Sequence, residues 1–245
     1  MGDMLKKIGI LTYNVKHRKT YDTLCLLKAR GYSEVCVYAQ PMHYKKSFTP
    51  YISHRPVLNM EIPDLVEVCK NFGYSYEEGI LDELNIPAEM PLLVCGAGII
   101  PEQFVKEHTI INSHPGMIPF SRGLDSFKWA IWEDKPIGVT THLIGEYVDG
   151  GEIIDQKQIE IDEGDTFFEV AMQVYETEID MLVTALEKLN EEHRFVNPEE
   201  YVVHKRMPHD IESHLLEKFE DYKKIANGKI KNIAGYNESL GGGYS

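Results

Sequence analysis

The sequence has few of the features that mark membrane or secreted proteins. Its longest apolar stretches, such as Pro91–Cys95 and Gly98–Pro101, have the length of a strand and are far too short to cross a bilayer. The first residues lead directly into a strand pattern and lack the apolar core of a signal peptide. We therefore expect a cytoplasmic protein with no membrane partner.

Cysteine and positive charge are also scarce. The four cysteines, at positions 25, 36, 69 and 95, form no Cys-x-x-Cys pair and have no histidine at metal-ligand spacing, which favours buried thiols and indicates no metal site. The 25 Lys and Arg residues against 39 Asp and Glu residues give a net charge of -14, which argues against a nucleic-acid partner. A small ligand in a locally basic pocket is still compatible with this charge.

The sequence does contain alternating strand and helix patterns. Among its 245 residues, buried strands are expected at 7–13 and 34–39 with a helix at 20–30 between them, which indicates a parallel, right-handed crossover unit. We therefore predict an α/β fold with a Rossmann-like, doubly wound, mostly parallel sheet flanked by helices. Further strands are expected at 92–96, 109–112, 138–143 and 152–161, a loop at 40–60, and further helices at 62–72, 126–132 and 166–189.

The chain changes character after its longest predicted helix. That helix opens with a capping-box pattern, Thr166 followed by Glu169 three positions later. Beyond it the chain is polar, with one amphipathic stretch (211–225) and a glycine-rich end (240–243). We predict an α/β domain at 1–189 and a small C-terminal helical/β appendage at 190–245. We expect the appendage to form a homodimer and to end in a flexible tail.

Three polar residues are placed where a ligand can meet them. Asn112 and His114 fall where a predicted strand ends, and ligands of open α/β sheets bind beyond the carboxyl ends of the strands. Residues two apart in extended backbone point the same way, and Pro115 keeps His114 extended. Asp149 lies in an Asp-Gly-Gly turn between two strand patterns, where a carboxylate can be held at a loop tip.

An amide, an imidazole and a carboxylate are the groups that acyl transfer to an amine requires. The histidine can carry a proton at neutral pH. The Asn amide can donate to the oxyanion of a tetrahedral intermediate, and the Asp can support the charged imidazole. From composition alone, a histidine at a strand end is more often a hydrogen-bonded structural residue, and an Asp-Gly-Gly sequence is more often a simple turn.

A resemblance to a known family favours the catalytic interpretation. The chain resembles the folate-dependent formyltransferases, which include glycinamide ribonucleotide, methionyl-tRNA and nucleotide-sugar N-formyltransferases. The resemblance is strong over residues 90–160 and rests on fold pattern alone before that. The motifs that carry it are Asn112-x-His114-Pro115, Met117-Ile118-Pro119, Arg122-Gly123, Gly138-x-Thr140-x-His142 and Val148-Asp149-x-Gly151.

The resemblance implies roles for individual residues. Asn112, His114 and Asp149 match the catalytic trio of the family, and the formyl donor would be N10-formyltetrahydrofolate, with tetrahydrofolate as product. His142 could orient the site or be a core histidine. The folate would rest on two loops. The first matches Gly96, Ala97, Gly98, Ile99 and Ile100, for which an ordinary strand-to-helix turn is the alternative, and the second matches Glu146, Tyr147 and Val148.

The sequence also narrows the choice of acceptor. The purine-pathway enzymes carry a glycine- and serine-rich loop after the first strand, whereas Thr12–Lys19 has no glycine. The methionyl-tRNA enzymes have a sizeable second domain, for which too few residues remain. The resemblance therefore favours a nucleotide-linked deoxyamino sugar as the acceptor. The alternative acceptor is glycinamide ribonucleotide or another small amine. A more distant alternative is that the protein is a non-catalytic folate- or nucleotide-binding module. The substrate-binding candidates are Tyr13, Lys16, His17, Arg122 and Lys128, with Tyr38, His54 and Arg55 as further pocket candidates, and a solvated loop is the alternative for 16–19.

Overall fold

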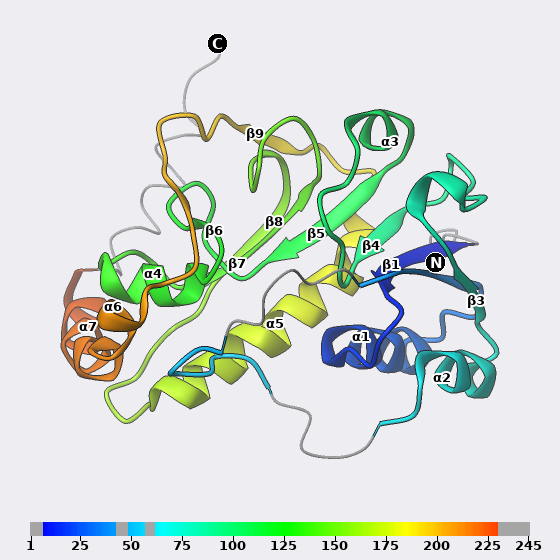
Figure 1. Cartoon of the computed structure of the whole chain (residues 1–245). Coiled ribbons are helices and arrows are strands. Elements are labelled where there is room, and N and C mark those ends of the chain that lie inside the picture. Colours follow the sequence, from blue (N-terminus) through cyan, green and yellow to red (C-terminus); the bar gives the residue numbers. More distant parts are fainter. Residues whose placement is uncertain (1–6, 43–48, 57–61, 230–245) are drawn as a thin grey trace, which may run out of the picture.

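A computed structural model of the chain describes residues 7–42, 49–56 and 62–229. Most of its strands form one eight-stranded sheet (Figure 1). In chain order these strands are β1 (Ile8–Tyr13), β2 (Val35–Gln40), β3 (Ser75–Glu78), β4 (Leu92–Val94), β5 (Ile110–His114), β7 (Gly138–Leu143), β8 (Gly151–Gln158) and β9 (Arg194–Val196). Two further strands, β6 (Arg122–Gly123) and β10 (Val203–His204), pair with each other.

The sheet is parallel on one side and antiparallel on the other. Its order is β3-β2-β1-β4-β5-β7-β8-β9, parallel from β3 to β5 and antiparallel from β5 to β9. The predicted doubly wound, mostly parallel α/β sheet is therefore confirmed. The chain leaves β1 toward β2 on one side and returns to β4 on the other, so the topological switch point lies between β1 and β4, where ligands of such sheets bind.

Helices cover both faces of the sheet because side chains alternate between the faces along each strand. Ile8 and Ile10 pack with the helices on one face, whereas Leu11 packs with Phe104 on the other. The helices are α1 (Arg18–Ala29), α2 (Leu65–Phe72), α3 (Glu102–Glu107), α4 (Ser126–Trp132), α5 (Phe167–Lys188), α6 (His209–Glu212) and α7 (Leu215–Lys229), with a 3-10 turn at Leu81–Glu83. Figure 1 shows α1, α2 and α5 on one face of the sheet and α3 on the opposite face.

The elements with clear apolar patterns lie where the sequence predicts them, and the capping box of Thr166 and Glu169 forms at the start of α5. The strands that the sequence did not predict are short or exposed at the sheet edge. β3, for example, has the sequence Ser-Tyr-Glu-Glu and no alternation of apolar residues. β5 extends two residues beyond its predicted end, so that Asn112 and His114 both belong to the strand.

The chain after α5 packs against the rest of the protein. β9 pairs with β8, and α7 contributes Phe219 and Tyr222 to a hydrophobic cluster that contains Phe127 of α4. The fully buried Lys128 and Glu212 form an ion pair between α4 and α6. The division after Leu189 stays a prediction, and the glycine-rich end at 240–243 lies outside the described residues. None of the described helices is both long and apolar enough to span a membrane.

Candidate active site

Strands β5 and β7 bring Asn112 and His114 to one face of the sheet. The two residues are the third and fifth of β5, so their side chains point the same way. In the antiparallel register with β7, Asn112 lies opposite His142. Asn112 Nδ2 and His142 Nε2 are 3.2 Å apart, which fixes the plane of the amide.

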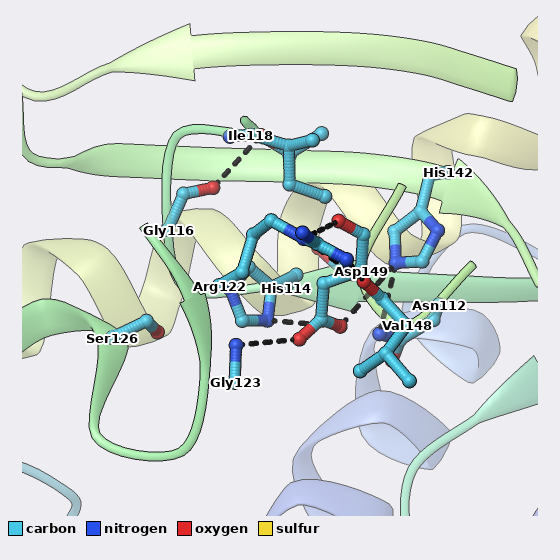
Figure 2. A network of polar contacts seen from close by, with 12 residues as sticks. Asn112, His114, Gly116, Ile118, Arg122, Gly123, Ser126, His142, Val148 and Asp149 are labelled. Carbon is cyan, nitrogen blue, oxygen red and sulfur yellow. Dashed lines mark hydrogen bonds and ion pairs between the residues drawn. The ribbon is translucent and has the colours of Figure 1, made fainter. Parts of the chain in front are cut away.

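The turn between β7 and β8 adds the carboxylate. Asp149 adopts a left-handed backbone conformation, with φ of 45°, which is uncommon for a residue other than glycine. Its Oδ2 accepts a hydrogen bond of 2.8 Å from the backbone N–H of Gly123, and its Oδ1 lies 3.4 Å from His114 Nδ1. Figure 2 shows the Asp149 carboxylate between Gly123 and the two imidazoles. The structure thus brings together three residues that the sequence separates by up to 37 positions (149 minus 112).

The contacts of His114 determine which ring nitrogen is available for chemistry. Its Nε2 is 2.9 Å from the backbone carbonyl oxygen of Ser121, and because a carbonyl only accepts, Nε2 must carry the hydrogen. Nδ1 therefore faces Asp149 as the nitrogen that can take up a proton. Gly116 permits this arrangement, since a Cβ there would lie 2.5 Å from the Ser121 oxygen and 2.8 Å from His114 Nε2.

His142 is held in one neutral tautomer. Its Nδ1 donates to the carbonyl oxygen of Leu143 at 3.1 Å, which leaves Nε2 to accept the Asn112 N–H. Burial lowers the pKa of His142 from 6.5 to about 4, although the nearby Asp149 acts in the opposite direction. The ring is therefore neutral at pH 7 and orients the Asn112 amide, whose second N–H is left for another acceptor.

The pKa of His142 predicts how stability depends on pH. Because the folded-state pKa of about 4 is below the ordinary 6.5, the unfolded chain binds a proton first as the pH falls, and folding stability is lost between pH 6.5 and 4. Over this pH range, we expect the free energy of unfolding of His142→Gln to fall by up to about 3 kcal/mol less than that of the wild type. Thermal unfolding at pH 7, 5.5 and 4.5 measures it, with His214→Gln as the control because that side chain is exposed. Parallel pH profiles for wild type and His142→Gln would contradict the assignment.

The two loops expected to hold folate lie on the α3 side of the sheet. Ile100 and Ile144, one from each loop region, pack against the same hydrophobic cluster. Ile99 is fully exposed and Val148 is 61% exposed, so both loops present apolar surface to solvent. This placement is compatible with a flat ligand, and the assignment of folate to these loops stays a prediction.

Two of the expected acceptor residues, Tyr13 and His17, lie together at the switch point between β1 and β4. Tyr13 ends β1, and a Cβ on Gly96, just after β4, would lie 2.8 Å from the Tyr13 ring and 3.3 Å from His17. Lys19 connects this region to β5, since its Nζ is 3.4 Å from the carbonyl oxygen of Ser113. The loops after β1 and β4 and the end of β5 are therefore in contact.

A buried carboxylate pairs with two basic side chains beside this switch point. Glu178 of α5 is 1% exposed and pairs with Lys19 at 2.7 Å and with Arg55. Burial works against the ionised form, but Arg55 and Lys19 outweigh it and lower the pKa of Glu178 to about 2. Sequence reasoning missed this residue. A carboxylate between Val174 and Leu182 in an apolar helical stripe was the signal that could have found it.

Two residues predicted to bind the substrate, Arg122 and Lys128, contact other parts of the protein instead, which corrects their assignment. The Arg122 guanidinium is 4% exposed and donates to backbone carbonyls, including Pro198 at 2.7 Å and Tyr201 at 2.8 Å. Lys128 is fully buried and paired with Glu212. Both look like pocket residues in the sequence because they follow the catalytic loop, but both side chains point into the protein. In the parts of the chain that the structure describes, no group of three or more His, Cys, Asp or Glu side chains is placed to hold a metal ion.

A doubly wound α/β fold that presents an amide, an imidazole and a carboxylate together at the carboxyl edge of its sheet is suited to acyl transfer. Residues 74–186 match the family model described as formyl transferase. Over these residues the chain is similar to formyl transferases.

Curated proteins with similar sequences are also formyltransferases. The chain is 32% identical over 108 residues to phosphoribosylglycinamide formyltransferase of Bacillus subtilis, covering 42% of this chain and 55% of the relative. It is 26% identical over 165 residues to methionyl-tRNA formyltransferase of Caldanaerobacter subterraneus, covering 66% and 53%. The chain thus spans about half the length of these curated relatives. An N-formyltransferase structure from Helicobacter canadensis shares the fold, with a TM-score of 0.59 and 17% identity over 87% of this chain and 80% of that one.

Proposed function

We propose that this protein transfers a formyl group from N10-formyltetrahydrofolate to the primary amine of a nucleotide-linked deoxyamino sugar. The observation that carries the proposal is the convergence of Asn112, His114 and Asp149 at the carboxyl end of β5. The three side chains supply an oxyanion donor, a proton acceptor and a charge that stabilises the protonated acceptor.

The geometry supports a stepwise mechanism. The amine nitrogen attacks the formyl carbon and forms a C–N bond, while the carbonyl electrons move to the oxygen. The second N–H of Asn112 donates to this oxyanion. His114 takes the amine proton at Nδ1, and its two N–H groups then face Asp149 and the Ser121 carbonyl. Breaking the bond to N10 of the folate restores the formyl carbonyl, and the proton passes to that leaving nitrogen.

The residues around the switch point between β1 and β4 support an anionic acceptor. Tyr13 ends β1, Lys16 and His17 follow it, and Lys19 and Arg55 together carry one more charge than Glu178 neutralises. A phosphate or pyrophosphate would find compensating charge there. The Helicobacter canadensis protein of the same fold is described in complex with folinic acid and dTDP-3-aminofucose, which are a folate and a nucleotide-linked amino sugar.

A second acceptor is favoured by a specific observation. Phosphoribosylglycinamide formyltransferases from two bacteria are 32% identical to this chain over their matched regions. Glycinamide ribonucleotide also carries a primary amine and a phosphate, so the same chemistry would serve. The absence of glycine from Thr12–Lys19 argues for the amino sugar.

A mass-spectrometric screen tests both candidates. The protein is incubated with N10-formyltetrahydrofolate and either glycinamide ribonucleotide or a panel of amino-sugar nucleotides. We expect one amino-sugar nucleotide to gain about 28 daltons, the mass of CO. Turnover of glycinamide ribonucleotide alone would support the second acceptor. Folate binding without formylation of any amine would support a non-catalytic binding module instead.

A further inference from the structure

The chain after α5 reaches the catalytic loops through residues 194–207, here named the 194–207 segment. Its strand β10 pairs in parallel with β6, the two residues that directly follow Ser121. Pro198 of this segment packs against Gly150, where a Cβ would overlap the proline ring. The segment therefore touches both loops that build the site, one beside His114 and the other beside Asp149.

Arg122 joins the segment to the catalytic turn. Its Nε donates to the backbone oxygens of Val148 at 3.0 Å and Asp149 at 2.9 Å. Its Nη1 donates to Pro198 and Tyr201, and its Nη2 donates to Val148 as well. All of these acceptors are backbone carbonyls. A guanidinium suits such a position because its five N–H donors form a rigid planar fork, which no other side chain offers.

These bonds bear directly on the orientation of the Asp149 carboxylate. Asp149 needs a left-handed backbone conformation, and Arg122 binds the carbonyl on each side of its Cα. The neighbouring Gly123 donates its N–H to Asp149 Oδ2, and β10 lies so close that a Cβ on Gly123 would overlap the backbone of His204. Arg122, Gly123 and the 194–207 segment thus enclose the turn that aims Asp149 at His114.

We propose that Arg122 is a positioning residue that acts through Asp149, using the carbonyls of Pro198 and Tyr201 as its fixed support, so that the 194–207 segment is part of the catalytic machinery. The proposal rests on the proposed function for its effect on rate. Its structural half stands without it, because the Gly123 to Asp149 hydrogen bond exists before any substrate binds.

Arg122→Lys tests the proposal, since lysine keeps the charge but loses the fork. We expect kcat with N10-formyltetrahydrofolate and the most active acceptor of the panel to fall about 10²-fold, as small misplacements of catalytic groups do, while both KM values stay within about threefold. Arg30→Lys is the matched control, because Arg30 binds Asp180 and Thr184 far along α5. In an Asp149→Asn background, Arg122→Lys should cause no further loss. An equal loss in both backgrounds overturns the proposal.

A second readout does not depend on activity. Arg122→Lys should reduce hydrogen-exchange protection of the Gly123 amide, which donates to Asp149 Oδ2, by about tenfold or more, whereas Arg30→Lys should not. If Arg122→Lys does not fold, Gly150→Ala replaces it, because the added Cβ displaces Pro198 from the turn and leaves Arg122 in place. Unchanged Gly123 protection in the folded variant overturns the proposal. If the protein formylates no amine but the variant loses protection of the Gly123 amide, the positioning role of Arg122 is supported and only the proposed function is contradicted.

Discussion

His114→Gln is expected to lower kcat for formyl transfer about 10³-fold, in the range that a positioned acid–base group contributes. Glutamine keeps a hydrogen-bond donor for the Ser121 carbonyl but has no nitrogen that can take up a proton opposite Asp149. The amine proton then has to leave to solvent. We expect the KM for folate to change little, because the folate loops do not include this side chain.

Steady-state and single-turnover kinetics measure the effect, and near-ultraviolet circular dichroism confirms the fold of the variant. His214→Gln is the matched control, because His214 is an exposed histidine at the start of α7. A His114→Gln protein that keeps more than about a tenth of the wild-type kcat would remove His114 from the mechanism.

Asp149→Asn is expected to lower kcat by a similar factor of about 10³. The substitution is nearly isosteric, and the amide oxygen can still accept the Gly123 N–H. It removes the negative charge 3.4 Å from His114 Nδ1, so the protonated imidazole loses its counter-charge in a buried site. Proton transfer from the amine to His114 then becomes slower.

Asp155→Asn provides the control for this substitution. Asp155 lies in β8, the strand that follows the same turn, but pairs with Lys188 at 2.6 Å away from the site. We expect its kcat to stay within about threefold of wild type. If Asp149→Asn and Asp155→Asn have equal kcat values, the carboxylate has no part in the chemistry.

Several parts of the site could be predicted from the sequence because they depend on local geometry. The two-residue spacing of Asn112 and His114 places both side chains on one face of any strand. The Asp-Gly-Gly turn places a carboxylate at a loop tip, and the antiparallel pairing of β7 and β8 returns that tip to β5. The alternation of strands and helices was enough to predict the doubly wound sheet.

The remaining features depend on contacts between distant parts of the chain. Arg122 looks like a surface ligand beside the catalytic loop until Pro198 and Tyr201, 76 and 79 positions away, are placed against it. The pairing of Glu178 with Arg55 spans 123 positions. No local pattern encodes such partners, so the sequence indicated the charged residues without showing which of them face a ligand.

The enclosure of the Asp149 turn by the 194–207 segment also has a consequence for synthesis of the protein. All three members of the trio are added to the growing chain before residue 198. Until Pro198 and Tyr201 are in place, Arg122 lacks two of its carbonyl acceptors and the carboxylate turn lacks its outer wall. The enclosure of the Asp149 turn is therefore completed only after the 194–207 segment, in the last quarter of the chain, has been added and has docked.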